Sequence, residues 1–222
     1  MVAKGSKKGD LVYGIGINDV YGDCIRTSEF IIVYSAWKGM LQRCYSPIWL
    51  EKHPSYIGTK VCDEWKYYSN YKSWHLNNYI EGYELDKDII DGKSKIYSPY
   101  TCSFVPPLIN TCILDGGNTS YSSPYPLGVS YHKKAKQMKN ERSRPYETNI
   151  TLYGKRKNLG SFKTPEEAHK AWQFTKRDYL LELINKYCND VVPEVIQGLQ
   201  RRVDILNYDI KNSRETKSLS KV

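Results

Sequence analysis

The chain has 222 residues, of which 40% are hydrophobic and 13% aromatic, and it carries a formal net charge of +9 at pH 7. This composition is typical of a globular protein with one or two domains, and it excludes a fully disordered chain. No run approaches the ~18 apolar residues that span a bilayer, and no apolar segment follows the basic start of the chain. We therefore expect a cytoplasmic protein that does not bind a membrane.

The positive charge is concentrated in the second half of the chain. Residues 1–126 contain 13 basic and 13 acidic side chains, whereas residues 127–222 contain 20 basic and 11 acidic ones, so the whole excess of 9 lies in the second half. A neutral half followed by a basic half is typical of a protein in which one module binds phosphate groups. A charged, solubilising surface is the alternative explanation.

The first half predicts helices followed by a strand–turn–strand–helix unit. After an irregular arm over 1–23, apolar side chains at helical spacing predict helices within 29–44 and 65–79. The patterns that follow predict a strand at 83–90, a tight turn at Asp91-Gly92 and a returning strand at 95–97. They also predict a helix in the later part of 100–114.

Six cysteines are spread through the chain without a Cys-x-x-Cys pair. Since no secretory signal is apparent, this spacing predicts buried thiols rather than disulfides. A structural zinc site formed by Cys44, Cys62 and Cys102 is the less favoured alternative, because zinc sites usually contain paired cysteines. We expect no metal role for His132 or His169, which fit ordinary surface or helix positions.

The second half predicts a three-stranded sheet followed by a long helix. A linker rich in Gly, Ser and Pro covers 115–126. The strand patterns lie at 127–132, 147–153 and 157–162. Thr164, Pro165 and Glu167 then form the residue pattern of a helix N-terminus. An amphipathic segment at 191–206 is interrupted by proline and glycine, and we expect the last dozen residues to be disordered.

The middle strand divides its side chains between the two faces of this sheet. Alternation places Ile150 and Leu152 towards the helix. It places Asn149, Thr151 and Tyr153 on the opposite, open face. A small sheet fits the major groove of DNA, where asparagine reads adenine, arginine reads guanine and lysine holds phosphates. The candidate DNA-binding residues are Arg142, Arg144, Asn149, Thr151, Lys155, Arg156 and Lys157.

A set of short motifs occurs between residues 125 and 187. They are Gly128-Val129, Leu159-Gly160, Phe162, Thr164, Glu166-Glu167-Ala168 and Ala171. Together they resemble the pattern of the Apetala/ethylene-response-factor type of DNA-binding domain. The resemblance implies that the sheet reads double-stranded DNA in the major groove.

Four further stretches cover most of the chain between Gly14 and the linker. They read YSAWKGMLQRCYS, VCDEW, YELDKDI and YSPYTCSFVPPLIN. These stretches are similar to a group of phage-encoded HNH-like homing endonucleases, whose site is a ββα-metal (His-Me) finger. Many proteins of that group end in an Apetala-type domain, so the two resemblances support each other. A phage origin implies the cytoplasm of a host cell.

The resemblance also implies roles for individual residues. Carried over by position, Asp86 and Asn110 bind a divalent ion, Mg2+ or Mn2+. Lys87 stands where the family has its histidine, and Thr101 replaces the middle asparagine. Lysine is an ammonium ion near neutral pH, so Lys87 suits contact with a phosphate oxygen better than proton abstraction. The candidate base is then Asp88, or the metal-bound water ionises unaided.

The expected fold class is α+β, with an HNH-like ββα-metal unit and extra helices linked to a three-stranded sheet plus helix. The expected domains are 1–114 (nuclease-like), 115–126 (linker), 127–187 (DNA-binding) and 188–222 (C-terminal helix and tail). The leading hypothesis is a metal-dependent endonuclease of phage homing type that acts on double-stranded DNA. A non-catalytic, sequence-specific DNA-binding or regulatory protein on a degenerate HNH scaffold is the alternative. An interaction protein that binds a host factor is a third hypothesis.

Overall fold

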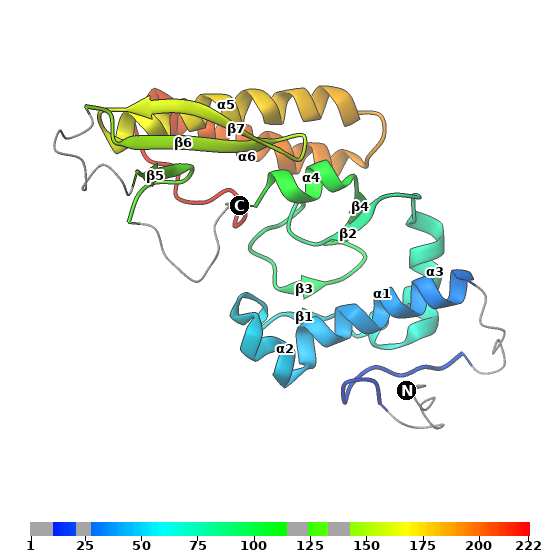
Figure 1. Ribbon diagram of the computed structural model, residues 1–222. Helices are drawn as coiled ribbons and strands as arrows, with labels where there is room; N and C mark the ends of the chain where they lie inside the picture. Colours follow the sequence, from blue (N-terminus) through cyan, green and yellow to red (C-terminus); the bar gives the residue numbers. More distant parts are fainter. Residues whose placement is uncertain (1–10, 21–27, 115–123, 133–142) are drawn as a thin grey trace. The chain divides into compact units, whose positions relative to one another are not determined.

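The fold belongs to the α+β class, as the sequence predicts. The computed structural model describes residues 11–20, 28–114, 124–132 and 143–222. The chain divides into two compact units, each drawn in Figure 1. The first unit comprises residues 1–87 and 94–104, and the second comprises residues 88–93 and 105–222.

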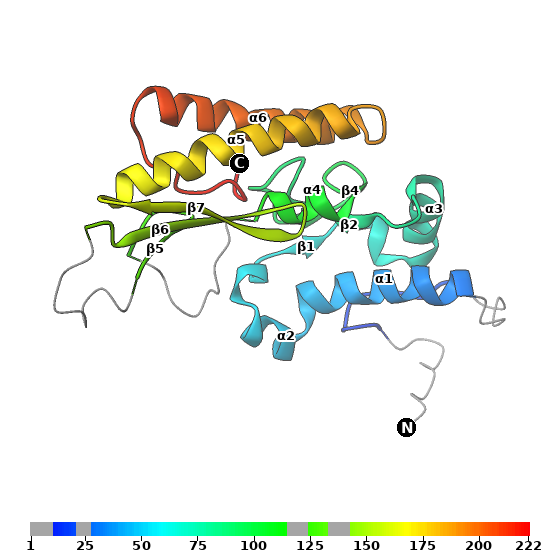
Figure 2. The same ribbon diagram turned by 45° about the horizontal axis from the view of Figure 1, so that its top comes forward.

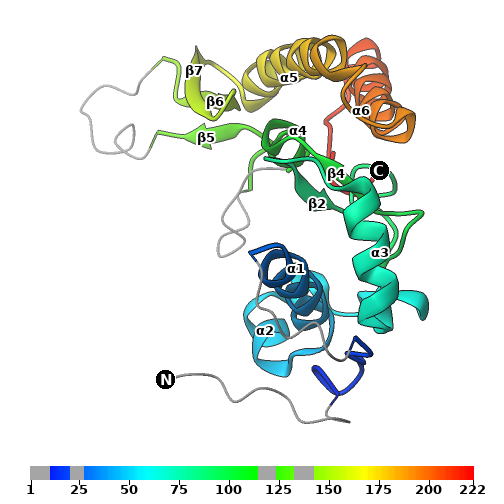
Figure 3. The same ribbon diagram turned by 90° about the vertical axis from the view of Figure 1, so that its right-hand side faces the viewer.

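The first unit is built around aromatic side chains of its helices. Its elements are α1 (Ser28–Tyr45), α2 (Pro47–Lys52), the 3-10 helix η1 (Pro54–Tyr56), β1 (Lys60–Val61), the 3-10 helix η2 (Glu64–Lys66), α3 (Tyr68–Asn78), β2 (Glu84–Asp86), β3 (Ile96–Tyr97) and the first part of β4 (Ser103–Val105). Trp37 of α1 and Tyr68 of α3 are fully buried, and Figure 3 views α1 nearly end-on beside α3. The indole N–H of Trp37 donates a 2.7 Å hydrogen bond to the carbonyl of Trp65. This aromatic core joins α1 to α3.

The strands of the first unit pair differently from the hairpin that the sequence predicts. β3 pairs in parallel with β1, with Val61 opposite Tyr97, and β2 pairs with β4. The predicted hairpin between 83–90 and 95–97 is therefore wrong, because the backbone groups of β3 are bonded to β1 instead. A strand–strand–helix order still exists along the chain, since β4 leads directly into α4 (Pro107–Cys112).

The second unit contains the predicted three-stranded sheet and long helix. Its elements after α4 are β5 (Val129–Tyr131), β6 (Tyr146–Leu152), β7 (Lys155–Phe162), α5 (Pro165–Tyr187) and α6 (Pro193–Lys211). The sheet is antiparallel in the order β5-β6-β7. Figure 2 shows α5 lying on the sheet and α6 lying along α5. The sheet therefore has one face covered by α5.

The start of α5 follows the predicted capping chemistry. The hydroxyl of Thr164 accepts a 3.2 Å hydrogen bond from the backbone N–H of Glu167. The Glu167 carboxylate accepts a 3.1 Å hydrogen bond from the backbone N–H of Lys163, one residue before the expected partner. These bonds satisfy backbone donors that the first turn of a helix leaves unpaired.

α6 is longer than the sequence predicts, and it is one continuous helix. The expected interruptions at Pro193 and Gly198 do not occur, because Pro193 begins the helix and Gly198 lies inside it. A side chain at Gly198 would overlap the carbonyl group of Ile89. The glycine therefore permits the close approach of α6 to residues 88–93.

The C-terminal segment is ordered and partly buried, so the prediction of a disordered tail is wrong. Thr216 and Leu219 are fully buried. Fully buried Arg202 of α6 donates to the carbonyls of Leu219 at 2.7 Å, Asp88 at 2.8 Å and Ile89 at 3.0 Å. An arginine has five donors in a rigid fork, so one side chain can fasten several backbone segments.

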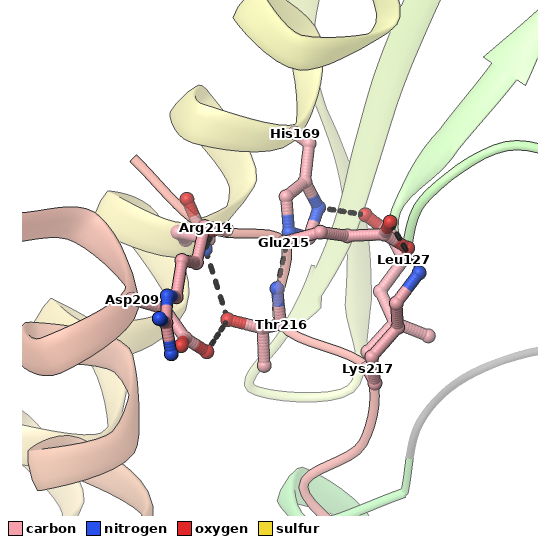
Figure 4. Close-up of polar contacts among 8 residues, drawn as sticks. Leu127, His169, Asp209, Arg214, Glu215, Thr216 and Lys217 are labelled. Atoms are coloured by element: carbon pink, nitrogen blue, oxygen red, sulfur yellow. Dashed lines mark hydrogen bonds and ion pairs between the residues drawn. The ribbon is translucent and has the colours of Figure 1, made fainter. Parts of the chain in front are cut away.

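His169 lies on a helix, as expected, and it also holds the C-terminal segment in place. His169 is buried on α5, and its two ring nitrogens contact the backbone of Leu127 and Thr216. Figure 4 shows these contacts and the hydroxyl of Thr216 donating to Asp209 at 2.8 Å. The tail is thus held by polar contacts between residues far apart in sequence.

The linker expected over 115–126 lies mostly outside the described residues, as does much of the arm over 1–23. The second compact unit includes residues on both sides of that linker. In the ranges that the structure describes, no helix is long and apolar enough to cross a membrane.

Candidate nucleic-acid interface and candidate metal site

The open face of the β5-β6-β7 sheet is polar. In the antiparallel register, Asn149 lies opposite Asn158, and Thr151 lies opposite Arg156. Opposite residues in adjacent strands share a face, and the Asn158 amide donates a 3.2 Å hydrogen bond to the side-chain oxygen of Asn149. Ile150 is buried and alternates to the side that α5 covers. The four residues on the face away from α5 are therefore Asn149, Asn158, Thr151 and Arg156.

The three consecutive basic residues at the start of β7 point in different directions. Arg156 shares the open face with Thr151. Lys155 lies opposite Leu152 and Lys157 lies opposite Ile150, so these two lysines alternate to the other side of the sheet. All three basic side chains are exposed, and β7 is the edge strand of this sheet. The two lysines therefore lie at the exposed edge of the sheet and alternate to the side opposite the open face.

The other residues predicted for this face divide into three cases. Arg144 is exposed and precedes β6, while Arg142 lies outside the described residues. Tyr153 does not lie on the open face, because it occupies the turn after β6 with a φ of 50°. Its hydroxyl donates to Glu182 of α5 at 2.7 Å, and its ring packs edge-on against Tyr179 with the ring centres 5.0 Å apart.

A pocket of about 650 Å3 opens beside β6, where the shorter strand β5 has ended. Asn149 and Arg156 line it from the sheet, and Trp172 and Lys176 line it from α5. Lys176 is buried, and its ammonium group donates to the carbonyl oxygen of Cys112. Sequence reasoning missed Lys176, although its position four residues after Trp172 puts it on the packing face of α5.

In the first unit, Lys87 and Arg43 lie beside Tyr97, and Asp86 precedes Lys87 in the chain. Asp86 ends β2, and both Asp86 and Lys87 are buried. The Lys87 Nζ lies 5.8 Å from the centre of the Tyr97 ring. The Nε of Arg43, in the last turn of α1, donates a 3.2 Å hydrogen bond to the Tyr97 hydroxyl, and its guanidinium carbon lies 5.6 Å from the same ring centre. Two cations from different parts of the unit therefore lie over one ring, and one of them follows the buried Asp86 in the chain.

The neighbouring cysteines are free thiols, and burial raises the pKa of two of them. Burial raises the pKa of the Cys44 thiol to about 12 and that of the Cys102 thiol to about 12. A metal ligand must be a thiolate, so a raised pKa disfavours zinc. Cys62, Cys112 and Cys188 are also free thiols, and Cys62 is half-buried rather than buried. Within the described residues, no group of three His, Cys, Asp or Glu side chains is placed to hold a metal.

The predicted catalytic residues belong to different units. Asp86 and Lys87 are in the first unit, whereas Asp88 and Asn110 are in the second. The backbone carbonyl of Asp88 accepts the bond from Arg202, and Asn110 is half-buried on α4. The metal site that combines Asp86 with Asn110 therefore stays a prediction.

The oxygen donors of the predicted site fit Mg2+ or Mn2+ in their chemistry. These ions bind through one or two carboxylate or carbonyl oxygens and keep several waters, which a carboxylate at Asp86 and an amide at Asn110 can accommodate. The positive charge of Lys87, which follows Asp86 in the chain, opposes binding of a bare cation. We therefore expect metal binding to strengthen when an anionic ligand occupies the site.

The chain matches no family model, no curated protein and no solved structure.

Proposed function

We propose that the second unit binds double-stranded DNA through the open face of the β5-β6-β7 sheet. The observation that carries this proposal is the strand register, which aligns Asn149, Asn158 and Arg156 on the face away from α5. A small sheet enters the major groove, where amide and guanidinium groups hydrogen-bond to base edges. Lys155 and Lys157, exposed along the edge of β7, are suited to phosphate contacts.

The test compares two variants of the full chain that each lose three positive charges. The first replaces Lys155, Arg156 and Lys157 with glutamine. The matched control replaces Lys170, Lys211 and Lys221, which are exposed outside the sheet. In mobility-shift titrations over a range of salt, the first variant should bind duplex DNA more weakly, and its slope of log affinity against log salt should fall by about 0.9 per lost phosphate contact. Equal weakening by the control would show that positive charges outside the sheet contribute to DNA binding as much as those on β7. That result would contradict the proposal.

A second function is metal-dependent cleavage of double-stranded DNA by an HNH-like endonuclease of the phage homing type. The observation that favours it is the burial of Asp86 and Lys87 at the end of β2, where Lys87 and Arg43 both lie over the ring of Tyr97. In this proposal Asp86 and Asn110 hold Mg2+ or Mn2+, which stabilises charge on the scissile phosphate and supplies an activated water. Lys87 contacts a phosphate oxygen, and Asp88 is the candidate base.

This proposal is tested with supercoiled plasmid and purified protein in Mg2+ or Mn2+, with and without a chelator. The parent protein should nick or linearise the plasmid. Asp86→Ala should abolish cleavage while duplex binding stays near the parent value. Lys87→Ala should lower the rate, whereas Lys87→His, which restores the family's usual base, should keep or raise it. If neither the parent nor Lys87→His cuts with any divalent ion, the chain is a non-catalytic DNA-binding protein.

A further inference from the structure

Arg43 is a half-buried cation that has only neutral partners in the described part of the chain. Its side chain makes a hydrogen bond and a ring contact with Tyr97, and among the residues that the structure describes it forms no ion pair. Burial lowers the pKa of Arg43, but the Tyr97 hydroxyl raises it, and the resulting pKa lies above the ordinary value. Arg43 therefore stays charged, although a half-buried charge without a counter-ion is unfavourable.

Tyr97 does not neutralise this charge. Tyr97 is buried, and burial raises the pKa of its hydroxyl, so the phenol stays protonated and neutral. Its hydroxyl accepts from Nε of Arg43, which fixes one edge of the planar guanidinium. The Nη atoms form the other edge, and they remain as donors for a ligand.

Gly39 leaves space on α1 next to this second edge. Gly39 lies one turn before Arg43 on α1, and a side-chain carbon added there would meet only one heavy atom within 4 Å, the Nη1 of Arg43 at 3.8 Å. Nη1 therefore borders the space that a side chain at position 39 would occupy. An arginine that is anchored at Nε and open at Nη is preorganised for a planar or tetrahedral oxyanion.

We propose that Arg43, oriented by Tyr97, binds a backbone phosphate of nucleic acid beside Lys87. The two Nη donors match two non-bridging phosphate oxygens, and Lys87 supplies a second positive charge over the same Tyr97 ring. The first 126 residues carry equal numbers of acidic and basic side chains, so this pair of cations is not part of a generally basic surface. A role of this phosphate in cleavage rests on the proposed nuclease function, but phosphate binding by Arg43 does not require cleavage.

The direct test follows the Nε–Hε group of Arg43 by 1H–15N NMR of the full chain. The signal is assigned by its absence from the spectrum of Arg43→Lys, and Tyr97→Phe should shift it by removing the acceptor. Titration with a short mixed-sequence DNA duplex should move the Arg43 signal to saturation. A parallel titration with inorganic phosphate distinguishes a nucleic-acid site from a small-anion site. An unmoved signal with the duplex, or movement with inorganic phosphate alone, overturns the proposal.

Binding measurements with a matched pair of variants give a second test. Arg43→Gln should lower the slope of log affinity against log salt for duplex DNA by about 0.9, the value for one phosphate contact. Lys38→Gln removes one exposed charge from the same helix and should leave the slope unchanged. Equal slopes for the two variants contradict the proposal. If Arg43→Gln lowers the slope and the parent never cleaves DNA, the Arg43 site stands and the nuclease proposal fails.

Discussion

The Nε2 atom of His169 accepts a hydrogen bond of 3.0 Å from the backbone N–H of Thr216. The Nδ1 atom of the same ring lies 2.9 Å from the carbonyl oxygen of Leu127, so Nδ1 carries the proton. His169 is therefore neutral, and it joins α5 to the residues before β5 and to the C-terminal segment (Figure 4). A proton added to Nε2 removes the acceptor for Thr216.

This geometry predicts a fall in stability at mildly acidic pH. Burial lowers the pKa of His169, and also that of His75 in the first unit. A histidine with a lowered pKa in the folded state binds more protons when unfolded, so its contribution is complete above an unfolded pKa of about 6.5 and falls as the pH drops below it. Urea denaturation at pH values from about 7.5 to about 5.5 should show this decline.

A pair of histidine variants assigns part of that decline to His169. His169→Gln should show a smaller loss of stability over the same pH interval, whatever its absolute stability. His53→Gln, which changes an exposed histidine, should keep the parent's pH dependence. An unaltered pH dependence in His169→Gln would mean that the ring is not held neutral in the folded protein.

The two helical glycines Gly198 and Gly39 should respond oppositely to alanine. Gly198→Ala places a carbon against the carbonyl of Ile89, where backbone must move, so we expect a loss of about 1–3 kcal/mol in the free energy of unfolding. Gly39→Ala enters open space in α1 and should stabilise by about 0.5–1 kcal/mol through helix propensity. Thermal and urea denaturation measure both variants, and equal effects would contradict the close packing at Gly198.

Thr164 should contribute to stability through its hydroxyl rather than its methyl group. Thr164→Ala removes the acceptor for the Glu167 N–H and should cost about 1 kcal/mol. Thr164→Ser keeps the hydroxyl and should stay close to the parent. Urea denaturation compares the three proteins, and similar losses in both variants would show that capping is not the cause.

Asn149 and Lys157 should affect DNA binding in different ways. Asn149 lies on the open face, so Asn149→Ala should change the preferred base at one position of a selected site, with a discrimination of about 1–3 kcal/mol. Lys157→Gln should weaken binding to all sequences nearly equally. Selection from a random duplex pool, followed by affinity measurements, distinguishes the two effects. Uniform weakening by Asn149→Ala would place this residue outside base recognition.

Local sequence patterns determined much of the second unit. Three strand patterns between 127 and 162 appear as β5, β6 and β7, and the start chemistry at Thr164 begins α5. Buried Ile150 faces α5, as the alternation along the strand predicts. These features depend on residues a few positions apart, so short-range periodicity and capping chemistry are sufficient to predict them.

Pairing between distant segments was decided only by the tertiary structure. The sequence around β3 fits a hairpin with β2, but its backbone groups bond to β1, more than thirty residues earlier. Arg202 and His169 order the C-terminal segment by bonding to backbone atoms that lie far away in the chain. Arg43 became a candidate ligand-binding residue only once Tyr97 was placed against α1. Such contacts leave no periodic pattern, because hydrogen bonds and buried charges depend on which surfaces meet in the folded chain.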